Sequence, residues 1–283
     1  MFGFLNVYKP TGMTSHDVVA RLRRVTKVKQ IGHTGTLDPF AEGVLPICIG
    51  KATRLIEYLA DDKAYIGTVQ LGQSTTTYDT EGEGVKFSDK IVAREDIETA
   101  LENFRGEIEQ LPPIYSAIKV NGKKLYEYAR EGKEVKIEPR RVNISKLEIV
   151  DFKSELRQVS LFIECSKGTY IRSIANDLGE VLGTYGHLIK LVRVKAGEFG
   201  VNEAIKLDEL DSMDVVEKNL IYPLEKMHFP QREINEKEKA IVSNGGTIRA
   251  NSETEFVTLT YKGTLCAVAK RFDDVLKCEK VFL

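Results

Sequence analysis

The chain contains 283 residues, of which 42% are hydrophobic and 29% are charged. This balance supplies enough apolar surface for a folded core and excludes the disordered, fibrous and collagen-like classes. With 41 Lys and Arg against 42 Asp and Glu, the net charge of −1 gives no overall attraction to nucleic acid. Any polyanionic partner must therefore bind at local basic patches. At this length we expect one large domain, or one domain with a small appendage.

The sequence contains no sign of a membrane segment, a disulfide framework or a metal site. No apolar run approaches the roughly 20 residues of a transmembrane helix, and residues 1–9 lack the features of a signal peptide, so we expect a cytoplasmic protein. The four cysteines are widely spaced, with no C-x-x-C pair and no His at ligand spacing. This pattern predicts reduced thiols, mostly in the core, at Cys48, Cys165, Cys266 and Cys278.

Two helices and a strand are predicted in the first half of the chain. After Ser15, the expected N-cap, residues 16–29 place apolar side chains at helical spacing, and their exposed face is basic. Residues 63–72 alternate between an apolar face that includes Tyr65 and a more polar face, which predicts a strand. Residues 95–104 repeat apolar positions with the period of a second helix.

Further strands and helices are predicted in the second half. Strands are expected at residues 142–152, 156–165 and 187–194. A helix is expected at residues 170–182, with Val181 on its buried stripe and Gly183 as its C-terminal stop. Helical signals return at residues 207–219. This mixture predicts an α+β (mixed α/β) body built on a sheet.

The last part of the chain has a different pattern. Beyond about residue 228, short predicted strands alternate with Gly-containing turns, at residues 255–261, 264–271 and 278–283. We therefore expect residues 229–283 to form a small β appendage.

The residues richest in chemical groups form one loop. Residues 32–45 contain three glycines, an Asp-Pro pair and a His, which predicts a tight loop whose backbone can approach a ligand closely. By itself, Asp38 before Pro39 is more simply explained as the start of a turn. The loop matches neither of the glycine-rich motifs that hold dinucleotides or nucleoside triphosphates.

Taken whole, this loop resembles the catalytic motif of the bacterial tRNA pseudouridine-55 synthase (TruB) family. Other segments resemble the family's motifs in the same order along the chain. They are K-P-T-G-M-T-S from Lys9, K-A-Y from Lys63, P-P-I-Y-S-A-I-K-V-N-G from Pro112, C-S-K-G-T-Y-I-R-S from Cys165 and L-I-K-L-V-R from Leu188. The joint resemblance covers residues 3 to about 200.

The resemblance implies a domain organisation. Residues 1–228 would form a pseudouridine synthase catalytic domain, built on a largely antiparallel sheet with flanking helices. Residues 229–283 would form a small PUA-like RNA-binding β domain. An insert at about residues 112–141 would hold the RNA.

The resemblance also implies the chemistry. Conversion of uridine to pseudouridine breaks the N1–C1′ bond and joins C5 to C1′, so no cofactor and no metal are expected. Asp38 would be the nucleophile, on either C1′ or C6 of the uridine. Arg172 would keep that carboxylate ionised, and Tyr65 would stack on the uracil and take part in proton transfer. From spacing alone, Arg172 could equally be a solvated helix residue and Tyr65 a core residue.

Other residues are implied in substrate binding. Tyr170 and Leu191 would form further walls of the uridine pocket, although Leu191 alone would be assigned to the core. His33 would contact the RNA near the flipped nucleotide. Lys9 would be either structural or a phosphate contact.

The predicted insert is locally basic. Residues 119–141 contain eight Lys and Arg against four Glu, which favours contact with phosphates. The expected RNA contacts are Lys119, Lys123, Lys124 and Arg130. The alternative is a solvated surface helix, which such a charge mixture also fits.

The predicted partner is tRNA, bound at its T arm by a monomer that needs neither a membrane nor an obligatory protein partner. Two alternatives remain open: a homologue that works within a guide-RNA complex, and a non-catalytic tRNA-binding or folding protein. The basic insert disfavours the first, and the joint presence of Asp38, Tyr65 and Arg172 disfavours the second.

Overall fold

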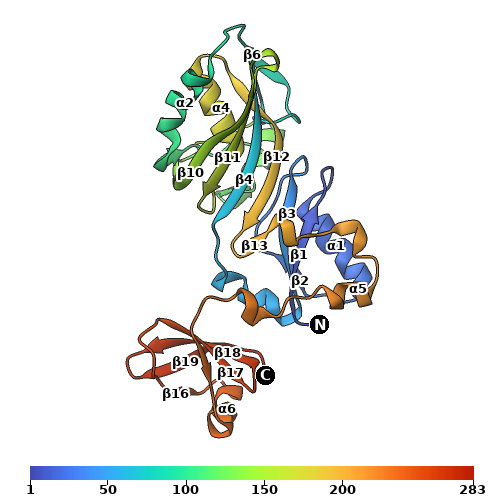
Figure 1. Ribbon diagram of the computed structural model, residues 1–283, viewed down its shortest axis with the longest axis vertical. Coiled ribbons are helices and arrows are strands. Elements are labelled where there is room, and N and C mark those ends of the chain that lie inside the picture. The colour runs from blue at the N-terminus through green and yellow to red at the C-terminus, as the bar shows by residue number, and fades with distance from the viewer.

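The computed structural model describes residues 1–283 as two β-sheets with flanking helices (Figure 1). The large sheet contains β1 (Gly3–Lys9), β2 (Ile31–His33), β3 (Glu42–Ile49), β4 (Lys63–Leu71), β7 (Gly106–Gln110), β10 (Arg140–Lys153), β11 (Gln158–Cys165), β12 (Gly186–Ala196), β13 (Phe199–Gly200) and β14 (Ile205–Lys206). Two small hairpins pair β5 (Gln73–Thr75) with β6 (Gly84–Phe87), and β8 (Lys119–Val120) with β9 (Lys123–Lys124).

Six α-helices accompany the strands. They are α1 (Ser15–Thr26), α2 (Arg94–Leu101), α3 (Leu125–Arg130), α4 (Ile171–Leu182), α5 (Met213–Lys218) and α6 (Glu236–Ser243). Helices α2 and α4 lie together beside the long strands of the large sheet, and α1 and α5 lie beside β1 and β3 (Figure 1). None of the helices has both the length and the apolar character needed to span a bilayer.

The large sheet confirms the predicted class. Its main strand order is β14-β1-β3-β12-β4-β11-β10-β7, and most neighbouring strands are antiparallel. The β3–β12 and β1–β14 pairs are parallel. Strand β4 lies in the middle, with Tyr65 between Ile163 of β11 and Arg193 of β12. The fold is therefore mixed α+β on a largely antiparallel sheet.

The alternation predicted for β4 is confirmed. Tyr65, Val69 and Leu71 are buried, whereas Thr68 and Gln70 on the other face are partly exposed. Because successive strand side chains point to opposite faces, Tyr65 is turned toward the same side of the sheet as α4. This choice of face decides where a site that uses Tyr65 can form.

Helix α4 ends as predicted but buries a different stripe. Gly183 takes the left-handed conformation (φ 67°) that terminates a helix. Val181 was predicted to point inward, and this was wrong, since its exposed fraction is 55%. The buried stripe continues from Leu178 to Leu182, four residues on, and Val181 falls on the solvent side.

The start of α1 also differs from the prediction. Thr14, not Ser15, caps the helix: its hydroxyl accepts a hydrogen bond from the Asp17 N–H, and the Asp17 carboxylate accepts one from the Thr14 N–H. Ser15 is thereby free to turn its buried hydroxyl toward Leu37, in the loop between β2 and β3.

The C-terminal β domain is a five-stranded sheet with α6 beside it. Its order is β15 (Gln231–Glu233), β17 (Phe256–Tyr261), β18 (Thr264–Phe272), β19 (Val275–Val281) and β16 (Thr247–Arg249). The last strand begins three residues earlier than predicted. One apolar cluster belongs to this sheet alone, and a second joins Leu265, Val268 and Phe282 to Phe4 and Val44 of the large sheet.

All four cysteines are free thiols, as predicted. Cys48, Cys165 and Cys266 are buried, and Cys278 is partly exposed. Burial raises the pKa of Cys48 to about 12 and that of Cys165 to about 11, mainly through desolvation of the thiolate.

The packing of α4 on β12 predicts a strict requirement for glycine at position 179. A Cβ atom there would lie 2.2 Å from the backbone N of Gly186, which cannot rotate away. Alanine favours a helix by about 1 kcal/mol, but so close an approach to backbone atoms places the overpacking cost at the upper end of its usual range, about 3 kcal/mol, so we expect Gly179→Ala to destabilise the protein by about 2 kcal/mol. Urea unfolding measures the change.

Gly200→Ala is the matched control, since a Cβ atom at that position meets nothing within 4 Å and the backbone φ is −100°. Its stability should stay within about 0.5 kcal/mol of the parent. Equal unfolding midpoints for the two variants would contradict the close approach of α4 to β12.

Candidate active site

A cavity of about 360 Å³ opens beside the N-terminus of α4. Its walls come from the β2–β3 loop, strands β4 and β12, the insert and the segment between β11 and α4. Lining residues include Thr34, Thr36, Asp38, Lys63, Tyr65, Ser116, Thr169, Tyr170, Arg172 and Leu191. Its volume and mixed polar and aromatic lining fall within the range of small-ligand sites.

Five of the predicted site residues meet in this cavity. Asp38, Tyr65, Tyr170, Arg172 and Leu191 all line it, although they are spread over more than 150 positions of the chain. Strand β4 supplies Tyr65, β12 supplies Leu191 and the start of α4 supplies Arg172. The sheet order brings them together, because β12 pairs with β4 and α4 packs on β12.

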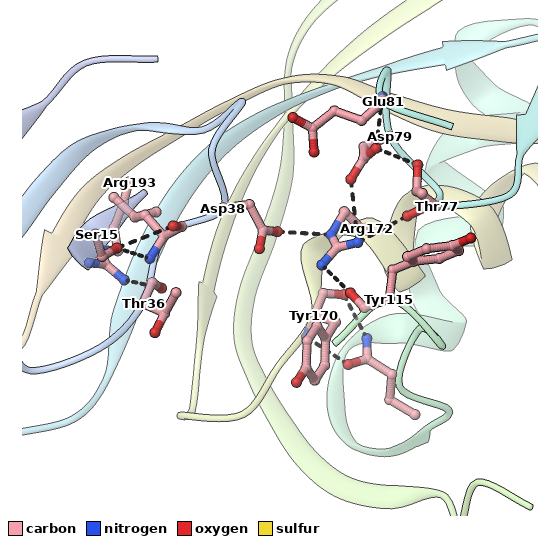
Figure 2. Close-up of polar contacts among 12 residues, drawn as sticks. Ser15, Thr36, Asp38, Thr77, Asp79, Glu81, Tyr115, Tyr170, Arg172 and Arg193 are labelled. Carbon is pink, nitrogen blue, oxygen red and sulfur yellow. Dashed lines mark hydrogen bonds and ion pairs between the residues drawn. The ribbon is translucent and has the colours of Figure 1, made fainter. Parts of the chain in front are cut away.

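Arg172 is the centre of the polar contacts (Figure 2). Its side chain is 6% exposed, and its Nε lies 2.9 Å from Oδ2 of Asp38. The remaining nitrogens contact Oδ2 of Asp79 at 3.3 Å and donate to the backbone carbonyls of Thr77 and Tyr115. Because each of the three guanidinium nitrogens contacts at least one of these partners, the orientation of the planar group is fixed.

Asp79 was not identified from the sequence. It follows β5, its side chain is 3% exposed, and Figure 2 shows it beside Arg172, next to Thr77 and Glu81. Its Oδ1 accepts hydrogen bonds from the Thr77 hydroxyl and the Glu81 N–H. The threonine-rich stretch around it reads as a polar turn, so no local signal marked Asp79 as a buried carboxylate.

The environment of the Asp38 carboxyl raises its pKa above the ordinary value. Its side chain keeps 35% of its surface open to the cavity while the rest is enclosed. Burial raises the pKa of Asp38, Arg172 opposes this rise, and the charge of Asp79 adds to it. One arginine shared between two carboxylates therefore compensates only part of their charge.

The loop that carries Asp38 is held through its backbone. The Ser15 hydroxyl accepts a hydrogen bond from the Leu37 N–H at 2.8 Å and donates to the Leu37 carbonyl at 3.2 Å. Fully buried Arg193 donates to the carbonyls of Gly35, Thr36 and Val44. The turn expected before Pro39 is also present, since the Ala41 N–H donates to the Asp38 carbonyl. Asp38 therefore both starts a turn with its backbone and lines the cavity with its side chain.

Lys9 lies beneath the same loop. It is fully buried, and its ammonium donates to the carbonyls of Pro10, Met13 and Pro39. Burial lowers the pKa of Lys9 to about 8, and the nearby Asp38 opposes this fall. Of the two roles that the sequence left open, this geometry favours the structural one, since a buried ammonium with three carbonyl partners cannot reach a phosphate.

The two aromatic walls have different supports. Tyr65 is 7% exposed, and burial raises the pKa of its phenol while nearby Arg193 opposes the rise. Tyr170 is anchored through its backbone, because the side-chain amide of Gln110 accepts from its N–H at 2.7 Å and donates to its carbonyl at 3.0 Å. Burial also raises the pKa of Tyr170. Neither phenol ionises readily near neutral pH.

The other predicted substrate contacts lie outside the cavity lining. His33 is partly exposed in β2, and burial lowers the pKa of its imidazole. Lys119, Lys123, Lys124 and Arg130 lie on the insert, in the β8–β9 hairpin and α3. None of these four cations lines the cavity. The part of the insert that does is its N-terminal segment, at Ser116 and Ala117.

The insert cations are partly engaged within the insert. Lys123 pairs with Glu131, whereas Lys119, Lys124 and Arg130 form no ion pair. Lys124 and Arg130 both lie over the ring of Tyr126, at 5.4 Å and 5.3 Å from its centroid. The hairpin and the short helix of the insert thus carry three cations that form no ion pair, Lys119, Lys124 and Arg130.

No cluster of three or more His, Cys, Asp or Glu side chains is arranged to hold a metal ion. Of the two carboxylates that contact the guanidinium of Arg172, Asp38 and Asp79, only Asp38 lines the cavity.

Comparison with known proteins identifies the family. Residues 23–171 match the N-terminal domain of the TruB family pseudouridylate synthases, and residues 172–227 match the tRNA pseudouridylate synthase B C-terminal domain. The chain belongs to the TruB family. It is 45% identical to the tRNA pseudouridine synthase B of Geobacillus thermodenitrificans, over 88% of this chain and 86% of that protein. The protein of the same name from Listeria monocytogenes is 42% identical, over 99% of this chain and 98% of that protein.

Solved structures of related TruB-like folds agree. One chain of a Cbf5–Nop10–Gar1 complex matches this chain with a TM-score of 0.76 and 26% identity. The match covers all of this chain and 85% of that chain. A chain of an H/ACA RNP bound to a substrate RNA with 2′-deoxyuridine gives a TM-score of 0.74 at 25% identity, with coverage of 100% and 85%. The resemblance predicted from the motifs is therefore confirmed for the family and the fold.

The site predicts opposite pKa shifts for two substitutions. Asp79→Asn removes a negative charge that raises the pKa of Asp38, so that pKa should fall. Arg172→Met removes the cation that opposes burial, so the pKa should rise further above the ordinary Asp value. The ¹³C shift of the Asp38 carboxyl carbon, followed over a pH titration, measures both.

Asp151→Asn serves as the control, because Asp151 is exposed on β10 and pairs with Lys153. It should leave the Asp38 titration unchanged. Movement of the Asp38 pKa in the same direction in both site variants would contradict the arrangement of one cation between two carboxylates.

Proposed function

We propose that this TruB family member isomerises uridine 55 in the T loop of tRNA to pseudouridine. The observation that carries the proposal is Asp38, open to a nucleotide-sized cavity and paired with the buried Arg172. The relatives named tRNA pseudouridine synthase B support tRNA as the substrate. A reaction that only exchanges an N1–C1′ bond for a C5–C1′ bond needs no added atoms and no net redox change.

Asp38 acts as the nucleophile. Its carboxylate forms a bond to C1′ or C6 of the uridine, the N1–C1′ bond breaks and the base turns. C5 then joins C1′, and the bond between Asp38 and the uridine breaks, which releases the free carboxylate. The proton lost from C5 and the proton gained at N1 balance, so the product is an isomer. Arg172 keeps Asp38 ionised against burial, and Asp79 holds Arg172 in place from its other side.

The cavity walls receive a base that has left its stack. A uridine inside a folded RNA cannot reach Asp38 until it is flipped out, and flipping loses stacking energy. Tyr65, Tyr170 and Leu191 supply replacement contacts on the walls of the cavity. Burial raises the pKa of both phenols, so they serve better as neutral stacking surfaces than as phenolate bases.

The insert and the C-terminal domain hold the remainder of the tRNA. Lys119, Lys124 and Arg130 have no carboxylate partner and are available to phosphates, and pairing with a phosphate would compete with the Lys123–Glu131 contact. His33 contacts the RNA beside the flipped base. Residues 229–283 form an accessory PUA-like RNA-binding domain. The enzyme acts as a monomer in the cytoplasm, without an obligatory protein partner.

Replacement of the nucleophile tests the catalytic assignment. Asp38→Asn keeps the shape of the side chain but removes its nucleophilicity, so we expect turnover to fall by at least about 10⁴-fold while tRNA affinity changes less than about threefold. Pseudouridine formed in an unmodified tRNA transcript, mapped by position, measures turnover, and filter binding measures affinity.

Asp151→Asn, on the far face of the sheet, should retain full activity. Turnover by Asp38→Asn within tenfold of the parent would refute the nucleophile assignment. A parent protein that binds tRNA but forms no pseudouridine would instead support the non-catalytic tRNA-binding alternative.

Neutralisation of the insert tests its role in RNA binding. The triple variant K123Q/K124Q/R130Q should weaken tRNA binding and flatten its salt dependence, because each lost phosphate contact removes roughly 0.7 to 0.9 from the log–log slope. Single-turnover rates at saturating enzyme should change little, since none of the three lines the cavity.

The matched control is K146Q/K153Q/K190Q, which removes three exposed cations from the face of the sheet opposite Tyr65. It should keep the parental affinity and slope. If the insert variant also kept both, the insert would be only a solvated surface.

A further inference from the structure

One cation of the catalytic cavity has no role in the chemistry proposed above. Lys63 opens strand β4 and lines the cavity together with Tyr65. The two residues are separated by one position, so their side chains project to the same face about 7 Å apart along the strand. Lys63 is therefore the next residue along the strand on the same face as Tyr65, the wall on which a flipped base would stack.

The surroundings of Lys63 are polar and closely fitted. A Cβ atom on Gly35 would lie 3.3 Å from the Lys63 Cε, so glycine at this position leaves room for the lysine side chain beside the loop that carries Asp38. The hydroxyl residues Thr34, Thr36 and Thr169 line the same cavity. The cavity thus contains several hydroxyl groups that can donate hydrogen bonds to a ligand.

Lys63 differs from the neighbouring lysines in having no anionic partner. Its ammonium donates to the backbone carbonyl of Asp61 at 2.9 Å and forms no ion pair. The carboxylates nearest in sequence are already engaged: Asp61 pairs with Lys167 at 2.6 Å, and Asp62 pairs with Lys195 at 2.9 Å. Lys63 is therefore a cation of the cavity that forms no ion pair with a carboxylate.

The electrostatics of Lys63 agree with an anion site. Burial lowers the pKa of its ammonium and the adjacent Arg193 lowers it further, while the charges of Asp61 and Asp62 oppose part of this fall. A ligand that carries a negative charge would relieve both effects, since an opposite charge nearby favours the protonated lysine. A uracil base is neutral, so the base alone does not provide this compensation.

We propose that Lys63 binds a backbone phosphate of the RNA adjacent to the target uridine, so that the cavity recognises a nucleotide and not only its base. The inference rests on the proposed function, because it takes the flipped uridine to lie against Tyr65. The sugar links base and phosphate within one nucleotide, which matches the placement of Tyr65 and Lys63 on one face of β4. Lys63 is a binding and positioning residue, and it takes no part in bond breaking.

The test replaces both members of the contact. Lys63→Met keeps the aliphatic chain and removes the charge. The RNA is a T-arm stem-loop in which one methylphosphonate, a neutral linkage, replaces the phosphate either 5′ or 3′ of the target uridine. Filter binding over a salt series gives the affinity and the salt slope, and single-turnover assays at saturating enzyme give the rate.

We expect Lys63→Met to weaken binding of the all-phosphate RNA at least about tenfold and to lower the salt slope by roughly 0.7. One of the two methylphosphonates should weaken binding to the parent but not to Lys63→Met, which identifies the contacted linkage. Lys63→Arg, which retains the charge, should restore most of the affinity.

Lys195→Met is the matched control, since Lys195 lies opposite Ala64 in β12, pairs with Asp62 and does not line the cavity. It should keep the parental affinity and slope. If each methylphosphonate weakened binding equally in the parent and in Lys63→Met, the two groups would not be in contact and the proposal would be overturned. A parent that shows the linkage-specific loss but forms no pseudouridine would retain the phosphate site and refute the proposed function instead.

Discussion

The site depends on one buried cation placed between two carboxylates. A guanidinium as enclosed as that of Arg172 is unfavourable unless each of its polar edges is matched, because its hydration is lost. Asp38, Asp79 and the carbonyls of Thr77 and Tyr115 supply these matches from three separate segments. The β2–β3 loop, the segment after β5 and the root of the insert must therefore converge on α4.

This convergence explains how far sequence patterns could predict the structure. Strands β4 and β11 were located well, because each has one buried and one partly exposed face and so alternates strictly. Val181 was misplaced because two helical spacings, i+3 and i+4, were both open after Leu178, and only the folded core, in which Leu182 is buried, distinguishes them. Local periodicity identifies the buried stripe of a helix but does not determine which residues lie at the edge of that stripe.

The site was predicted unevenly for a related reason. Asp38, Tyr65 and Arg172 lie in motifs with family resemblance, and the structure brings them to one cavity. Asp79 was missed because its partner lies 93 positions further along the chain. The sequence also does not distinguish a buried lysine such as Lys9 from an exposed one, since burial is decided by elements that are distant in sequence.

The manner in which the Asp38 loop is held has a consequence for sequence variation. Arg193 and Lys9 contact backbone carbonyls of the loop, and Ser15 contacts both the N–H and the carbonyl of Leu37. A backbone carbonyl is present whatever side chain the residue carries. The loop can therefore exchange side chains at positions such as Phe40 without moving the carboxylate, and transfer of the loop to another scaffold would require the three distant holders to be transferred with it.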